Sequence, residues 1–91
     1  MGSAIRCLVR RDTYRDSVEL MRVAAEVEQL PGVTRAALLM ATPANLDLLR
    51  EARLLNGENP KASPNDLLLA LRGKSAAALE AALLQIGRAH V

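Results

Sequence analysis

Three times within its 91 residues, the chain places a short apolar segment with the length of a β-strand before a segment with helical spacing. The three strands are predicted at Ala4–Arg10, Thr34–Ala41 and Leu67–Leu71. The first alternates apolar and polar residues, which is typical of a strand with one buried face, and we expect it near a sheet edge. The second and third are apolar runs bounded by turn residues, which favours burial on both faces, and the second is predicted to be central.

The first and third helices are indicated by apolar residues at helical spacing. Asp16 precedes Glu19 at the spacing of a capping box, and the periodic residues that follow continue to Leu30. The turn Pro31-Gly32 then ends this helix. The last helix is predicted over Ala76 to about Ile86, after a turn that contains glycine and serine.

The second helix has its own start signal in Thr42, a favoured N-cap, followed by proline at the first helical position. It is predicted to stop near Asn56-Gly57. The stretch from Asn56 to Asn65 collects Gly, Asn, Pro and Ser, and we expect it to form a surface loop that leads into the third strand.

The alternation of strands and helices predicts an α/β fold, a small βαβαβα domain with a three-stranded sheet and helices packed on it. A parallel sheet with right-handed crossovers fits this order, and so does a ferredoxin-like α+β arrangement that lacks its fourth strand. The two strands that are apolar on both sides require cover on both faces of the sheet. We expect part of that cover to come from outside this chain.

Composition restricts the function classes. A chain of 91 residues has room for one domain, and 51% apolar with 24% charged residues is ordinary for a globular protein. The core must be aliphatic, because the chain has no Phe or Trp and Tyr14 is its sole aromatic residue. It therefore lacks the aromatic platform on which RNA-recognition modules stack bases. The net charge of +2, without a basic tract, also argues against nucleic acid as a partner.

Other classes are disfavoured by single features. Cys7 is the only cysteine, and one thiol supports neither a disulfide framework nor a metal site. No apolar run approaches the roughly 18 residues that a membrane span needs, and the start of the chain has no signal-peptide core. We therefore predict a cytoplasmic protein that binds no membrane.

The sequence contains no Gly-rich phosphate loop, no metal-binding His/Glu pair and no nucleophile beside a base. We predict no catalytic, cofactor-binding or metal-binding residues, and no cofactor for this chain. Turn residues are the remaining candidates for a ligand-binding or interdomain role, and they are Asp16, Ser17, Thr42, Pro43, Asn45, Asn65 and Asp66.

Two interpretations of these turn residues are open. A strand that runs into a helix N-terminus exposes backbone N–H groups that suit an anion, and the segment from Thr42 to Asn45 is the best such candidate. Alternatively, Thr42 and Asp16 only cap their own helices, each cap contributing about 1 kcal/mol. In that case Asn45 faces solvent, and Asn65-Asp66 closes the loop before the third strand.

The last residues break the helical pattern. The segment from Ile86 to Val91 matches one reading frame of a widely used sequencing adapter, so we predict that it is not biological. Residues 1–85 would then be a single N-terminal domain of a longer protein, known from a truncated fragment of metagenomic or transcriptomic origin. His90, the only histidine, falls in this segment, and we assign it no role.

Three segments together resemble the N-terminal region of the FdrA family, in order and in spacing. They are Tyr14–Met21, Leu38–Asn45 and Pro64–Arg72, and Met-Ala-Thr-Pro-Ala-Asn within the second is the most specific string. The resemblance extends from about Ile5 to Gln85. The seven candidate turn residues all match the family strings.

FdrA proteins are similar to the α-subunit of succinyl-CoA synthetase, with CoA-binding and ligase-type domains after the segment seen here. The resemblance implies CoA and a nucleotide as cofactors of the parent protein, and a role as a subunit of an oxamate carbamoyltransferase assembly in purine and allantoin breakdown. This chain would be a non-catalytic accessory domain that docks on downstream domains or on another subunit, and that self-associates when isolated. The alternative is a regulatory module that binds a small carboxylate or phosphate.

Overall fold

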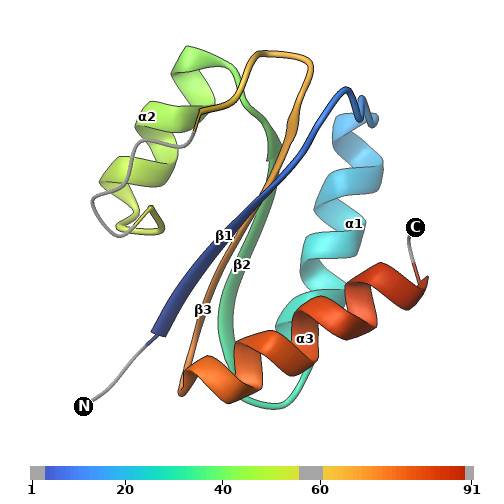
Figure 1. Ribbon diagram of the computed structural model, residues 1–91, viewed down its shortest axis with the longest axis vertical. Helices are drawn as coiled ribbons and strands as arrows, with labels where there is room; N and C mark the ends of the chain where they lie inside the picture. Colours follow the sequence, from blue (N-terminus) through green and yellow to red (C-terminus); the bar gives the residue numbers. More distant parts are fainter. Residues whose placement is uncertain (1–3, 56–60, 90–91) are drawn as a thin grey trace.

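Three strands and three helices alternate along the chain in the computed structural model, which describes residues 4–55 and 61–89. In chain order they are β1 (Ala4–Arg10), α1 (Ser17–Glu28), β2 (Val33–Met40), α2 (Pro43–Glu51), β3 (Leu67–Gly73) and α3 (Ala76–Ala89). This confirms the predicted small βαβαβα domain with a three-stranded sheet (Figure 1). Asn56, Gly57 and the unassigned His90 lie outside the described residues.

β3 is the central strand, because the sheet order is β1-β3-β2 and β3 runs antiparallel to both neighbours. Of the two arrangements that fit the sequence, the structure has the ferredoxin-like one with three strands. The alternative prediction of a parallel sheet is wrong. The edge position predicted for β1 is confirmed. The prediction that Thr34–Ala41 is central is wrong, since β2 lies at the other edge of the described sheet. An apolar run alone does not separate a central strand from an edge strand that helices cover.

Helices cover both faces of this sheet (Figure 1). On one face, α1 and α3 pack against alternate residues of β3 in a cluster that includes Leu20, Val23, Val27, Leu67, Leu69, Leu71, Leu79 and Ile86. On the other face, α2 and the residues after it form a second cluster that includes Leu49, Leu54, Leu55, Leu68 and Ala70. Successive side chains of a strand point to opposite faces, so β3 contributes to both clusters. For the central strand, the chain's own helices supply the cover.

α2 ends earlier than predicted because the chain turns back into the core. Arg53 adopts a left-handed conformation with a φ of 58°. The turn directs Leu54 and Leu55 into the cluster beneath α2, where both are buried. From β3, the guanidinium group of Arg72 donates to the carbonyl oxygens of Ala52 and Arg53 at 2.7 and 2.9 Å, which satisfies acceptors at the helix end. None of the helices in residues 4–55 and 61–89 is long and apolar enough to cross a bilayer.

Gly32 joins the start of β2 to the start of α3. Its φ of 80° is left-handed and favours glycine, and a Cβ atom at this position would lie 2.6 Å from the Cβ of Ala78. The carbonyl oxygen of Gly32 accepts a hydrogen bond from the N–H of Lys74 at 2.8 Å. The turn before β2 and the turn after β3 are therefore in direct contact. This contact positions the start of α3 at that end of the sheet.

Gly32→Ala should lower the free energy of unfolding by about 1 to 2 kcal/mol for the backbone alone, with a further loss from the contact with Ala78. In an Ala78→Gly background, the cost of the same substitution should be smaller, because the crowding is removed. Urea denaturation of the four variants measures both costs. Equal costs in the two backgrounds would contradict the role assigned to this contact.

Candidate functional site

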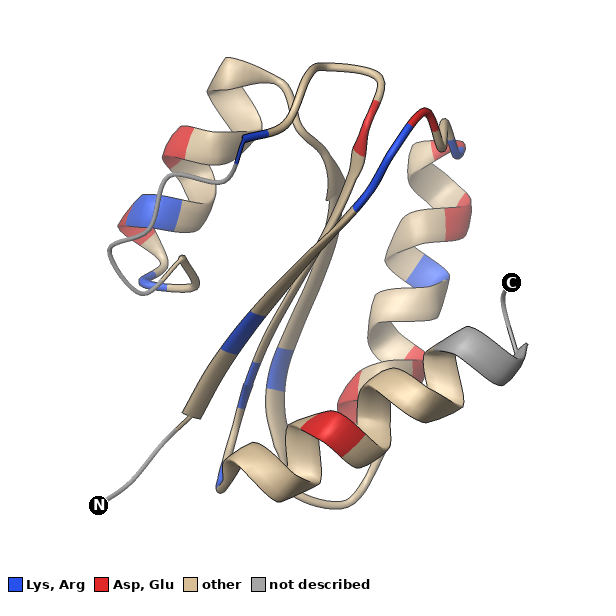
Figure 2. Ribbon diagram, viewed as in Figure 1, with Lys and Arg blue, Asp and Glu red and all other residues tan. Residues whose placement is uncertain are grey.

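The carboxyl ends of β1 and β2 meet at one end of the sheet, because both strands run antiparallel to β3. β3 begins at the same end. The candidate turn residues Asp16, Ser17, Thr42, Pro43, Asn45, Asn65 and Asp66 all belong to segments at this end. Figure 2 shows that acidic and basic positions of the chain lie near one another there, where β1 ends and β3 begins.

Asp16 caps α1, as predicted. Its backbone is extended, and its carboxylate accepts a hydrogen bond from the N–H of Val18 at 3.2 Å. The predicted capping box is not the arrangement found, because the carboxylate of Glu19 lies 3.5 Å from the guanidinium group of Arg15. Ser17 is the first residue of the helix and is exposed. The N–H of Val18, in the first turn of α1, is therefore already bonded within the chain.

Thr42 caps α2, as predicted, and Pro43 occupies the first helical position. The hydroxyl group of Thr42 accepts a hydrogen bond from the N–H of Asn45 at 3.2 Å. The expectation that Asn45 faces solvent is wrong. Its side chain is half-buried, and its Nδ2 atom donates to the carbonyl oxygen of Met40 at 2.9 Å. Asn45 thus links the start of α2 to the end of β2.

A groove of about 240 Å³ lies between the starts of α1 and α2. The residues that line it are Tyr14, Arg15, Asp16, Ser17, Leu20, Met21, Leu38, Leu39, Met40 and Asn45. Three of the predicted candidates are in this set, and the other four are not. Half of the lining residues are aliphatic, and the carboxylate of Asp16 would oppose an anion. The groove is better suited to an apolar group than to a phosphate or carboxylate.

Tyr14, Val18 and Met21 form an exposed apolar rim beside this groove. Their side chains are 75%, 71% and 71% exposed. Spacings of four and three residues place Val18 and Met21 on one side of α1, with Tyr14 in line before the helix. Sequence reasoning missed this rim. The signal was present, because the rim residues fall outside the inward stripe that begins at Leu20.

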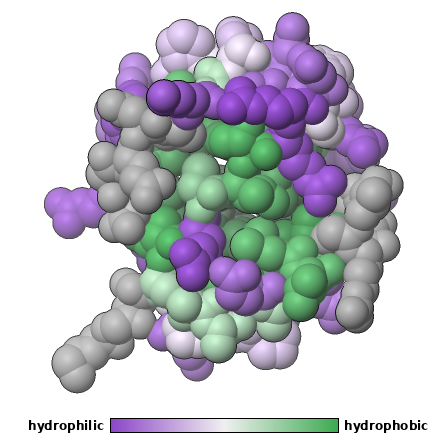
Figure 3. Space-filling view, viewed as in Figure 1, coloured by the Kyte–Doolittle hydropathy of each residue, from purple (hydrophilic) through white to green (hydrophobic). Residues whose placement is uncertain are grey.

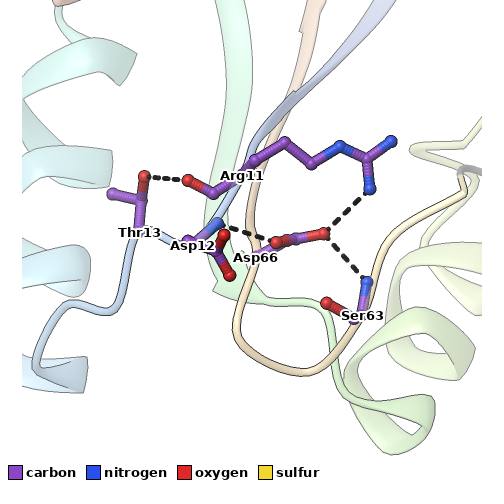
Figure 4. Close-up of polar contacts among 5 residues, drawn as sticks. All are labelled: Arg11, Asp12, Thr13, Ser63 and Asp66. Atoms are coloured by element: carbon purple, nitrogen blue, oxygen red, sulfur yellow. Dashed lines mark hydrogen bonds and ion pairs between the residues drawn. The ribbon is translucent and has the colours of Figure 1, made fainter.

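Asp66 forms a second centre at the same end of the sheet, between three segments of the chain (Figure 4). Its side chain is only 2% exposed. The carboxylate accepts hydrogen bonds from the N–H of Asp12 at 2.8 Å, the N–H of Ser63 at 3.0 Å and the guanidinium group of Arg11 at 3.1 Å. Its backbone carbonyl accepts a further bond from the N–H of Ala41 at 2.9 Å. One residue therefore ties together the ends of β1 and β2 and the start of β3.

The predicted role of Asn65-Asp66, closing the loop, describes only part of this arrangement. Asn65 is exposed, whereas Asp66 is buried. The N–H of Ser63 and then the N–H of Asp12 lower the pKa of Asp66, with a smaller contribution from Arg11, against an opposing effect of burial. The carboxylate is therefore ionised and fully bonded, which indicates a structural role. Two of its partners could not be found from the sequence, because Arg11 and Asp12 are 55 and 54 residues away from Asp66.

Comparisons with known proteins identify the family of this domain. Residues 3–89 match a family model described as "AllF, heavy metal-associated domain". The chain belongs to this family. Among curated proteins, it is 35% identical over 83 residues to the uncharacterized protein YahF of Escherichia coli strain K12. The match covers 91% of the chain but 16% of YahF, so the chain spans about a sixth of the length of this relative. No solved structure matches.

The residues of this AllF-type domain do not fit a heavy-metal ion. Soft metals prefer thiolate ligands, and Cys7 is the only cysteine. Cys7 lies within β1, half-buried against the cluster beneath α2. No group of three or more His, Cys, Asp or Glu residues in the described part of the chain is placed to hold a metal ion. Within residues 4–55 and 61–89, the match to this family is therefore carried by the fold and not by a set of metal ligands.

Asp66→Asn should destabilise the domain at neutral pH, because the amide cannot accept all the bonds that the carboxylate accepts. The pKa of Asp66 is lowered on folding, so its contribution is complete above the unfolded value of about 3.9 and is lost as the pH falls through the folded value. Urea denaturation from pH 7 to pH 2 measures this dependence. The difference between wild type and Asp66→Asn should shrink below about pH 4.

The matched control is Asp47→Asn, which changes an exposed carboxylate on α2. It should alter stability little at any pH. If Asp66→Asn were no more destabilising than this control at pH 7, the account of Asp66 would be wrong.

Proposed function

We propose that this chain is a non-catalytic accessory domain that docks, through the groove and its apolar rim, on a downstream domain of a longer protein. The observation that supports this most directly is the exposure of Tyr14, Val18 and Met21 beside an aliphatic groove. Three large apolar side chains that share one exposed face lose unfavourable contact with water when a partner covers them. Aromatic residues and methionine are also enriched where protein surfaces meet.

The parent protein, in this proposal, is FdrA-like and cytoplasmic, and it acts in an oxamate carbamoyltransferase assembly of allantoin and purine breakdown. The AllF family match and the resemblance of three segments to FdrA proteins support this assignment. The greater length of YahF is consistent with further domains in proteins of this kind. CoA, nucleotide and catalytic residues would then belong to the downstream part of the parent protein.

Met21→Lys should weaken the affinity of this domain for the remaining part of the parent protein by at least about tenfold, or 1.4 kcal/mol, since it places a charge in the apolar contact. The two parts are expressed separately from the source gene, and the dissociation constant is measured by titration calorimetry. Tyr14→Ser should have a similar effect.

Leu84→Lys is the matched control, because Leu84 is an equally apolar side chain, 63% exposed, on α3 and outside the groove. This variant should bind like wild type. If it weakened binding as much as Met21→Lys, or if neither variant had an effect, the rim would not be the docking surface.

A regulatory module for small ligands is the second candidate. It is favoured by one observation, that residues from the starts of two helices, Asp16 and Asn45, line the same groove. The bonded helix caps and the Asp16 carboxylate weigh against a carboxylate or phosphate ligand.

Thermal unfolding in the presence of oxamate, carbamoyl phosphate and CoA separates the two candidates. A specific ligand at a hundredfold excess over its Kd would stabilise the domain by about 2.7 kcal/mol. The docking proposal predicts no stabilisation by any of the three compounds. A shift that Asn45→Ala removes would favour the regulatory module instead.

A further inference from the structure

The groove has two walls that come from separate segments of the chain. Tyr14 and Asp16, between β1 and α1, belong to the first wall, and Met40 and Asn45, between the end of β2 and the start of α2, belong to the second. A partner that fills the groove contacts both walls. Its affinity therefore depends on how firmly the two walls are held at the right separation before it binds.

The second wall is connected to Asp66 through the peptide group between Met40 and Ala41. The carbonyl oxygen of this group accepts hydrogen bonds from Nδ2 of Asn45 and from the N–H of Thr42, both at 2.9 Å. Its N–H donates to the backbone carbonyl oxygen of Asp66 at 2.9 Å. Because a peptide group is a rigid plane, the position of Asn45 follows the position of Asp66.

The first wall is connected to the same residue through the turn after β1. The N–H of Asp12 donates to the carboxylate of Asp66 at 2.8 Å (Figure 4). The φ of Asp12 is 49°, a left-handed value that is uncommon for a residue other than glycine, so the turn depends on surrounding contacts. The hydroxyl group of Thr13 donates to the carbonyl oxygen of Arg11 at 2.9 Å, and Tyr14 follows directly.

The groups that make these connections lie outside the lining of the groove. Arg11, Asp12 and Asp66 are not among the residues that line it. The side chain of Arg11 is 66% exposed, and Figure 3 shows hydrophilic residues gathered over this end of the sheet, where β1 ends and β3 begins. A substitution in this network can therefore move the walls without changing the side chains that a partner contacts.

We propose that Asp66 is a positioning residue for the groove and holds both walls at the separation that the docking partner requires. The proposal rests on the docking function proposed above. Asp66 acts through Asp12 on the first wall and through the Met40–Ala41 peptide group on the second. Its contribution to docking is thus separate from its contribution to the stability of the domain.

Asp66→Asn should weaken binding to the remaining part of the parent protein by at least about fivefold, the lower end of typical coupling between separate sites. Titration calorimetry measures the dissociation constant at a temperature at which each variant is fully folded. Leu79→Ala is the control for lost stability, because Leu79 is buried beneath α3 and does not line the groove. This control should bind within about twofold of wild type, as expected for a distant site.

Arg11→Gln serves as a second variant if Asp66→Asn does not fold. It removes one bond to the carboxylate, while the N–H groups of Asp12 and Ser63 still donate to Asp66. It should weaken binding more than Arg10→Gln, which removes the same charge from the neighbouring residue. Equal binding by Arg11→Gln and Arg10→Gln, or equal losses for Asp66→Asn and Leu79→Ala, would overturn the proposal.

Nuclear magnetic resonance of the free domain reports the two walls without a partner. Asp66→Asn should shift the resonances of the Asn45 side-chain amide and of the Tyr14 N–H, and Arg11→Gln should shift them less. Leu79→Ala should leave both unchanged. Failure of the wild-type domain to dock would refute the docking function alone, whereas unchanged Asn45 and Tyr14 resonances in Asp66→Asn would refute the positioning role.

Discussion

The buried carboxylate of Asp66 holds together the end of the sheet from which α1 and α2 start. It accepts bonds from the segment after β1 and from the loop before β3, while its own carbonyl binds the residue that follows β2. Burying a carboxylate costs free energy unless its oxygens accept hydrogen bonds. The segments that donate these bonds must therefore keep their positions together for Asp66 to be stable in the core. The groove depends on this, because its two sides are the helices that follow β1 and β2 directly.

Local features of the sequence predicted local structure well. The bounds of β1 and the caps Asp16 and Thr42 were found because strand alternation and capping depend on near neighbours. The apolar run of β3 correctly indicated burial on both faces. Strand order and direction were not determined, because a βαβαβα pattern is compatible with parallel and antiparallel sheets alike. β2 was placed at the centre because its composition resembles that of β3, and only pairing separates the two strands.

The site was harder to predict than the fold, for a physical reason. Asn45 and Asp66 are polar residues in turns, where exposure is the usual outcome, yet both are drawn inward by specific partners. Asn45 binds Met40 at the end of β2, and Asp66 binds Asp12 from 54 residues away, and no sequence pattern fixes either pairing. The rim residues Val18 and Met21 were missed, although both fall outside the inward stripe of α1 that begins at Leu20.

The family description names a heavy metal, but the described residues do not offer the ligands that a heavy-metal ion prefers. The described residues form a compact fold and include one half-buried thiol, that of Cys7. Among the described residues, the most exposed large apolar side chains are Tyr14, Val18 and Met21, which together form the rim of the groove. A shared exposed apolar face of this kind is the feature on which the docking proposal rests.

The most direct test of the docking account is hydrogen exchange of this domain, alone and within the intact parent protein. The account predicts that backbone amides of residues 14–21 and 40–45, which surround the groove, become protected in the intact protein, while amides of α3 around Leu84 do not. Unchanged exchange around the groove in the intact protein would contradict it.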